Sequence, residues 1–451
     1  MVFDPGSIYE VKSNPAGLVT LAQATGAVTI GGGTVNVVTV PGNFRNGARY
    51  TILTAGGGRS GQFAGLTETL LLFDMTLAYN GNSVFLDVAR NSTTLCSLAV
   101  TANQCAASSI EPSVGSSNPV VAAVLSLPDV PAIQNALDLL SGEIYASAKG
   151  VLLDNSRYLR EAVTERARYA LGSAGQARGS AVWSHAFGSF GDQDGGNAAA
   201  LDTSIGGVFV GADAEVADLF QLGFATGYSN FSLNVDERAS SASSDDYHLA
   251  LYGRAMVGPL GLRFGAAQSW HDIQAKRSIE FSGFSDAERA DYGARTAQIF
   301  GEAGLELAGD GLILEPFAQV ARVSLSTDNF DERGGQAALT VFEDTEYATF
   351  ATYGLHAAIS FAIADGWNAT ARGTLGWRQV FGDAIPHSLH GLGSSSTFLI
   401  AGAPIAEDAL VIDAGLDVML GEKASVSLAY NGQIARFAND NGVRAHFNWR
   451  F

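Results

Sequence analysis

The sequence contains no long hydrophobic run. The best candidate, PVVAAVLSLPDVPAI, is short and is interrupted by Pro128 and Pro131. A membrane-spanning helix needs about 20 consecutive apolar residues, so none is predicted. The opening MVFDPGSIYE also lacks the basic start and apolar core of a secretory signal. A closed β-barrel, in which every backbone polar group is paired, is the other structure that can cross a membrane.

Positive charge and cysteine are also scarce. The chain has 26 Lys and Arg against 45 Asp and Glu, a formal net charge of −19. This excludes nucleic acid as a partner, because nucleic-acid binders concentrate positive charge. The two cysteines, Cys96 and Cys105, either close a small disulfide loop of an exported protein or are unrelated thiols, and we expect the disulfide. No other Cys and no nearby His joins them in a metal site.

Motifs that carry chemistry are missing as well. The sequence has no G-x-S-x-G, no H-E-x-x-H and no P-loop, since the glycine triplets 31–33 and 56–58 lack a following Lys-Ser/Thr. Most histidines fall in predicted strands, at lumen or rim positions, and one predicted loop holds two without a matching acidic ligand. The seven are His185, His248, His271, His356, His387, His390 and His446. We predict no catalytic residue, no metal site and no cofactor, and do not expect an enzyme.

Glycine is abundant, with 53 residues against 11 Pro, which favours β architecture. In residues 1–91, runs such as TVNVVTV and RYTILTA alternate with Gly, Asn and Pro turns, which predicts a β-solenoid. From 129 to about 170 apolar residues recur at helical spacing, with Asp129 as a candidate N-cap. After Gly150 this predicted helix is charged on nearly all sides, so it must lie in water or in a polar channel.

From residue 181 onward apolar and polar residues alternate, as in DLFQLGFATGY, which is the period of a β-strand. Short connections such as GDG and GEK alternate with long polar ones such as AKRSIEFSGFSDAERADYGA. This pattern is typical of transmembrane barrels. The predicted fold is therefore all-β: an antiparallel transmembrane β-barrel of about 12 strands with a helix in its lumen, preceded by a short β-solenoid. The strands are predicted near 181–190, 201–216, 218–232, 245–257, 260–274, 294–308, 312–327, 345–361, 366–380, 408–420, 423–436 and 442–451.

Several segments carry a resemblance to a known family. NPAGLVTLAQATGAVTIGGGTVNVVTVPGNFRNGARYTILTA resembles the end of a β-helical passenger, and ALDLLSGEIYASAKGVLLDNSRYLREAVTERA resembles a pore-threading helix. WSHAFGSFGDQDG resembles a first barrel strand, and the terminal VRAHFNWRF resembles an outer-membrane β-signal with Phe447, Trp449 and Phe451. Together these segments resemble the C-terminal part of the classical, type V secretion autotransporters of Gram-negative bacteria.

The resemblance implies four regions: a passenger end at 1–91, a linker at 92–128, a pore-threading helix at 129–177 and a translocator barrel at 178–451. It implies an outer-membrane protein, expected to be a monomer, that carries its own N-terminal passenger to the cell surface. The implied partners are the barrel-assembly machinery, periplasmic chaperones, and outer-membrane lipid with lipopolysaccharide. The acidic segments DQDGGN and NDNG are read as loop tips that lack the ligand spacing of a calcium site, although they can attract cations that bridge lipopolysaccharide.

The predicted helix raises two further expectations. Some members of the family cut themselves through an Asn on this helix, and here Asn155, preceded by Asp154, is either such a site or a plain polar residue. The helix arginines are expected to form ion pairs with lumen acids such as Asp413 and Asp417. These arginines are Arg157, Arg160, Arg166 and Arg168.

Two rival functions remain open at this stage. A porin-like channel is disfavoured because a porin begins directly with strands. A surface adhesin would need residues 1–91 as its working part, and these resemble the base of a scaffold.

The terminal aromatic residue gives a first test. We expect Phe451→Ser to leave most of the protein in the periplasm, because the change removes the last residue of the proposed β-signal. Membrane fractionation and heat-modifiable electrophoretic migration measure the outcome, with Phe437→Ser as a matched control. Normal membrane levels of folded Phe451→Ser protein would show that the assembly machinery does not need this residue.

Overall fold

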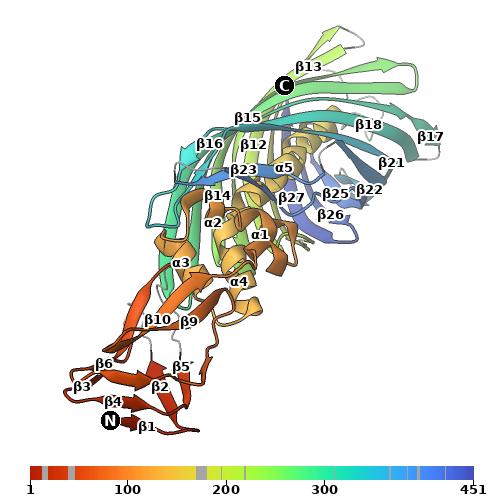
Figure 1. The fold of residues 1–451 in the computed structure, drawn as a ribbon. Helices are drawn as coiled ribbons and strands as arrows, with labels where there is room; N and C mark the ends of the chain where they lie inside the picture. Colours follow the sequence, from red (N-terminus) through yellow and green to blue (C-terminus); the bar gives the residue numbers. More distant parts are fainter. Residues whose placement is uncertain are drawn as a thin grey trace.

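The computed structural model places an N-terminal solenoid, a helical segment and a barrel in succession (Figure 1). It describes residues 1–12, 19–38, 46–168, 180–194, 196–217, 220–309, 311–364, 367–382, 384–393, 397–421 and 423–451. The predicted region boundaries at 91, 128 and 177 stay predictions, and the last of them lies outside the described residues.

The N-terminal part is built from short parallel strands, as predicted for a solenoid. One sheet contains β1 (Val2–Phe3), β4 (Val28–Ile30) and β7 (Arg59–Gly61), and a second contains β2 (Ile8–Lys12), β5 (Thr34–Val38) and β8 (Gly65–Thr67). A third places β3 (Ala22–Ala24) beside β6 (Arg49–Ala55). Alternate side chains such as Val11, Val35 and Ile52 fill the interior. The antiparallel hairpin of β9 (Phe73–Tyr79) and β10 (Ser83–Arg90) joins the third sheet through β6.

Short helices connect the solenoid to the barrel. The 3₁₀ helix η1 (Leu95–Leu98) and α1 (Ala102–Ala107) are joined by the Cys96–Cys105 disulfide. The segments α2 (Ile110–Val114), α3 (Pro119–Leu125) and α4 (Val130–Ser141) follow. Within the described residues, no helix combines the length and the apolar character needed to span a membrane.

The long helix predicted from residue 129 is broken at Gly142, so the prediction of one continuous helix is wrong. Asp129 caps α4 as expected, but α4 ends at Ser141, and α5 (Glu143–Arg168) begins after the break. Gly142 has a φ of +71°, and an added Cβ would lie 2.6 Å from Leu339. Apolar spacing continues across the break from Leu140 to Ile144, which is why the sequence pattern conceals it. The 26 residues of α5 span about 39 Å.

The predicted barrel is confirmed. Over the described residues, twelve antiparallel strands form a closed sheet, in which β11 pairs with both β12 and β27 and the ring is completed by β16 beside β18. They are β11 (Ala181–Gln193), β12 (Leu201–Ala217), β13 (Phe220–Val235), β14 (Ser240–Val257), β15 (Leu260–Phe281), β16 (Phe284–Leu305), β18 (Leu312–Thr327), β21 (Asp344–Ala364), β22 (Trp367–Gly382), β25 (Asp408–Leu420), β26 (Ala424–Ile434) and β27 (Ala438–Arg450). The short strand β17 (Leu307–Gly309) pairs with β18. Phe220, Leu222 and Phe224 point outward and are exposed, as the alternation predicts.

Several predicted loops are strands instead. The segment predicted as a long loop after residue 274 continues β15 and β16 to a tight turn between Phe281 and Phe284. Alternation persists there because Ile273, Ala275 and Ile279 are buried while their neighbours are exposed. NDNG likewise lies inside β27, so it is not a loop tip.

A separate four-stranded sheet is built from two of the long connections between barrel strands. It contains β19 (Phe330–Asp331), β20 (Leu339–Val341), β23 (His387–Leu392) and β24 (Thr397–Ala401). We call it the mouth sheet. Both α1 and α5 contact it (Figure 1). His387 and His390 therefore belong to a strand rather than to the predicted loop.

The close approach to α5 of the residue that follows β24 generates a prediction. A Cβ added to Gly402 would lie 2.5 Å from Ala146 C and from Ser147 N, both helix backbone atoms. We expect Gly402→Ala to destabilise the folded protein by about 1–3 kcal/mol, the usual cost of overpacking. Gly391→Ala is the matched control, because its Cβ would make only ordinary contacts, the nearest at 3.6 Å. Thermal unfolding in detergent compares the two, and equal midpoints would show that the contact yields without cost.

Candidate functional site

The barrel lumen is filled by α5, which makes it the candidate functional site. The helix contacts β12 to β16, β18 and the mouth sheet. Most of its side chains are buried, including the polar Arg157, Arg160 and Thr164. A helix charged on nearly all sides is therefore enclosed, as predicted, by a polar wall. Buried charges are stable only when paired, so each should have a partner on the wall.

One ion-pair network lies near the middle of α5. Arg157 Nη2 lies 2.7 Å from Asp440 of β27, and Arg157 Nη1 lies 2.6 Å from Asp154 of the helix itself. The other oxygen of Asp154 pairs with Arg378 of β22 at 2.7 Å. Arg160 Nη1 donates to Gln298 Oε1 at 2.7 Å. Asp154, Arg157 and Arg160 thus tie the helix to strands β22, β27 and β16.

A second network holds the last turn of α5. Arg166 donates to both oxygens of Asp213 in β12, at 2.6 and 2.8 Å, and Tyr252 donates to Asp213 at 2.8 Å. Arg168 Nη2 lies 2.6 Å from Glu302 of β16. Bidentate pairs such as Arg166–Asp213 fix geometry as well as charge. The end of the helix is therefore held in one register against the wall.

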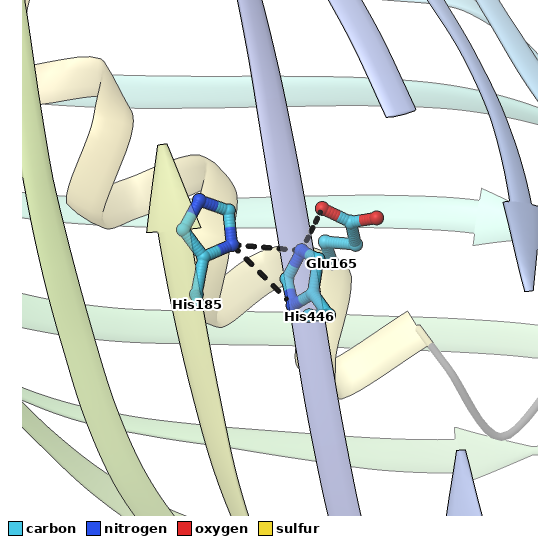
Figure 2. Close-up of side chains that lie close together, drawn as sticks. All are labelled: Glu165, His185 and His446. Atoms are coloured by element: carbon cyan, nitrogen blue, oxygen red, sulfur yellow. Dashed lines mark hydrogen bonds and ion pairs between the residues drawn. The ribbon is translucent and has the colours of Figure 1, made fainter. Parts of the chain in front are cut away.

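The third network is centred on Glu165. Its carboxylate pairs with Arg372 of β22, with Arg444 of β27 at 3.2 Å, and with His446 Nε2 at 3.1 Å. His446 Nε2 in turn lies 2.7 Å from Nδ1 of His185 on β11 (Figure 2). In this network the helix supplies the carboxylate, and the barrel wall supplies the arginines and the histidine that contact it.

The third network corrects the sequence-based prediction for Asp413 and Asp417. Neither pairs with a helix arginine: Asp413 pairs with Arg444, and Asp417 lies 3.1 Å from Arg372. The reason is the strand order, since β25 lies between β22 and β26, and β27 follows. The wall arginines therefore reach these acids before the helix does. The helix arginines meet Asp440, Asp213 and Glu302 instead.

The mouth end of α5 is held by the long connections. Tyr145 donates to Glu332, which also accepts two bonds of 2.7 Å from Arg277. Lys149 Nζ donates to Asp344 Oδ2 at 3.1 Å and to the His387 carbonyl at 2.7 Å.

The helical segment outside the barrel strands also carries a half-buried acid. Asp138 of α4 lies 3.3 Å from Arg238 of the connection between β13 and β14. Burial raises the pKa of Asp138, while the Gln104 amide and Arg238 oppose the shift. The raised pKa shows that these partners only partly replace the water that Asp138 loses.

The other predicted site residues lie in different places. Asn155 lies within α5 and lines a cavity together with Asp154 and Asp440. Phe447, Trp449 and Phe451 face outward and are exposed. The geometry tests neither the proposed self-cleavage nor the β-signal, and both stay predictions.

Sequence reasoning missed the meeting of Glu165, His185 and His446. Their ligand atoms all lie within 4.8 Å of one another. A usable signal was present, because a closed barrel pairs its first and last strands. The register sets Ala181 opposite Arg450, and hence His185 opposite His446.

These features define the class of protein. A closed, even-stranded barrel with apolar residues outside and a polar lumen is the architecture of outer-membrane proteins. Here the lumen also holds a charged helix, as in a translocator that has carried a chain through itself.

Comparisons with known proteins give the family. Residues 182–431 match the autotransporter β-domain family, and the chain belongs to it. Two curated relatives, both named extracellular serine protease and both from Serratia marcescens, are 32% and 31% identical over the whole of this chain. The chain spans about half the length of these relatives, 48% of each. The chain thus includes the translocator β-domain of an outer-membrane autotransporter.

A solved structure agrees on the fold. The translocator domain of the autotransporter NalP from Neisseria meningitidis matches with a TM-score of 0.51 and 16% identity. The match covers 66% of this chain and 98% of that structure.

The Arg166–Asp213 pair generates a prediction. We expect Arg166→Met to destabilise the folded protein by about 3 kcal/mol, because it leaves a buried carboxylate without its guanidinium partner. The double variant Arg166→Met, Asp213→Asn should recover part of this loss, since no unpaired charge remains. Thermal unfolding of the full chain in detergent measures both.

Arg333→Met is the matched control, because Arg333 and Asp291 form an exposed pair at 3.8 Å. Its effect should be within about 1 kcal/mol. A double variant less stable than Arg166→Met would contradict an ion pair between Arg166 and Asp213.

Proposed function

We propose that the barrel passes the residues N-terminal to α5 to the cell surface and then keeps α5 as a plug. The orientation of the helix carries this proposal. The first turn of α5 contacts the long connections through Tyr145–Glu332, whereas its last turn contacts Asp213, which is opposite Ala181 at the start of β11. The short connections of transmembrane barrels face the periplasm and the long connections face the cell exterior. The solenoid therefore stands on the outer side.

The cargo of the whole protein follows from its relatives. We infer that the protein carries a passenger of the extracellular serine protease class, because both curated relatives bear that name. We infer no catalysis by the chain described here, which lacks the motifs of a hydrolase. A surface adhesin remains the alternative for the passenger.

A porin-like channel fits less well than a plugged translocator. A barrel of more than eight strands is too wide for its own side chains to fill, and α5 takes up that space here. The ion pairs along α5 oppose a freely open pore. The expected partners, namely the assembly machinery, chaperones and lipopolysaccharide, and the expected monomeric state belong to the proposal. In the proposal, Asn155, with Asp154 beside it, is a plain polar residue of an uncut α5, and self-cleavage there is the alternative.

Planar-bilayer conductance tests the plug. The intact chain should show small or rare openings, whereas a variant lacking residues 143–168 should show larger and steadier ones, because the deletion removes the occupant of the lumen. A variant lacking residues 2–90 is the control, since it removes the solenoid and keeps α5. Heat-modifiable migration verifies that each barrel is folded. Equal conductance with and without α5 would place the helix outside the pore and defeat the proposal.

A further inference from the structure

Three possible metal-ligand atoms converge where the barrel closes. His185 of β11 and His446 of β27 are register partners across the pairing of the first and last strands, and Glu165 reaches them from α5 (Figure 2). His446 Nε2 lies 2.7 Å from His185 Nδ1 and 3.1 Å from Glu165 Oε2. Glu165 and His185 are buried, and His446 is nearly so. Three separate elements thus contribute one ligand atom each to a single point.

Hydrogen bonding alone serves this arrangement poorly. His446 Nε2 faces both the His185 ring and the Glu165 carboxylate, yet it can hold only one proton. If Nε2 accepts a proton from His185, its lone pair is occupied and the carboxylate receives no donor from this ring. If Nε2 instead donates to Glu165, His185 Nδ1 is left with only the longer contact of 3.4 Å to His446 Nδ1 on that ring. A cation that accepts electron pairs would satisfy all three atoms at once.

The donor set suits a zinc-like ion. Zn²⁺ binds His nitrogen and carboxylate oxygen at about 2.0–2.2 Å in tetrahedral geometry, which separates the ligand atoms by about 3.3 Å. The His446 Nε2 separations of 2.7 and 3.1 Å are close to that value, and all three ligand atoms lie within 4.8 Å of one another. The two rings are perpendicular to each other, so one ring must turn to bring the lone pairs onto one ion. Two imidazoles and one carboxylate also leave a fourth position for water.

The surrounding charge permits a cation despite two nearby arginines. Arg372 and Arg444 both contact Glu165, but they also pair with Asp417 and Asp413 respectively. Three carboxylates therefore face two guanidinium groups, a local excess of one negative charge. Arg444 can keep Asp413 as its partner when Glu165 Oε2 turns to a metal.

A cavity reaches one side of the site. Glu165 lines a cavity together with Glu161, Asp413 and Arg444. Among the described residues, neither histidine of the site lines this cavity, so an ion would approach the site from its Glu165 side.

We propose that Glu165, His185 and His446 bind one divalent transition-metal ion of the zinc class. The bound ion links α5 to the strand pair that closes the barrel. The site would stabilise the position of α5 as well as the pairing of β11 with β27, because each of the three elements contributes a ligand. It does not depend on which passenger the protein carries.

Metal titration of the full chain tests this proposal. The folded protein in detergent, stripped with a chelator, is titrated with Zn²⁺ by calorimetry and with Co²⁺ by visible absorption. One ion per chain and the intense visible bands of tetrahedral Co²⁺ are expected. His185→Asn and His446→Asn should each weaken binding by at least about 100-fold, since even residues behind the ligands commonly contribute 10- to 100-fold.

His248→Gln is the matched control, because His248 is another lumen histidine, held by Ser229 and Ser269. It should bind as the unchanged protein does. Heat-modifiable migration shows that each variant is folded, and if one histidine variant fails to fold, the other decides. Absence of stoichiometric binding, or binding that persists in the double histidine variant, would overturn the proposal, as would an equal loss in His248→Gln.

Discussion

The structure depends on one constraint: charge buried inside a barrel must be paired. A twelve-stranded wall encloses more space than its own side chains fill, and α5 occupies it. The helix brings four arginines and several acids into that space. The helix arginines form ion pairs with wall acids, namely Asp440, Asp213 and Glu302. The helix acids form ion pairs with wall arginines, namely Arg378, Arg372 and Arg444.

This pairing specifies position more than it adds stability. Desolvation offsets much of the attraction within a buried ion pair, but an unpaired partner is strongly unfavourable. A shift of α5 along the lumen would separate Arg157 from Asp440 and Arg166 from Asp213 together. The helix is thus selective for one register. A segment without these charged residues would form no such ion pairs as it passed through the lumen, so it would not be held at one position.

Much of the fold was accessible from the sequence. The twelve strands and the polar lumen follow from period-two alternation, because each barrel strand has one apolar and one polar face. The break at Gly142 was hidden, because apolar spacing continues through it and the packing of Gly142 against Leu339 of the mouth sheet is a tertiary contact. The partners of Asp413 and the meeting of His185 with His446 depend on strand register. Alternation identifies a face, but the closure of the barrel selects the neighbours.

The central claim is that α5 lies threaded in the lumen with the solenoid outside the cell. Protease digestion of intact cells that display the full chain tests it most directly. The account predicts that cleavage removes residues of the solenoid and leaves a membrane fragment that contains α5 and ends at Phe451. A chain that stays uncut until the outer membrane is permeabilised, or a protected fragment that begins after Arg168, would contradict it.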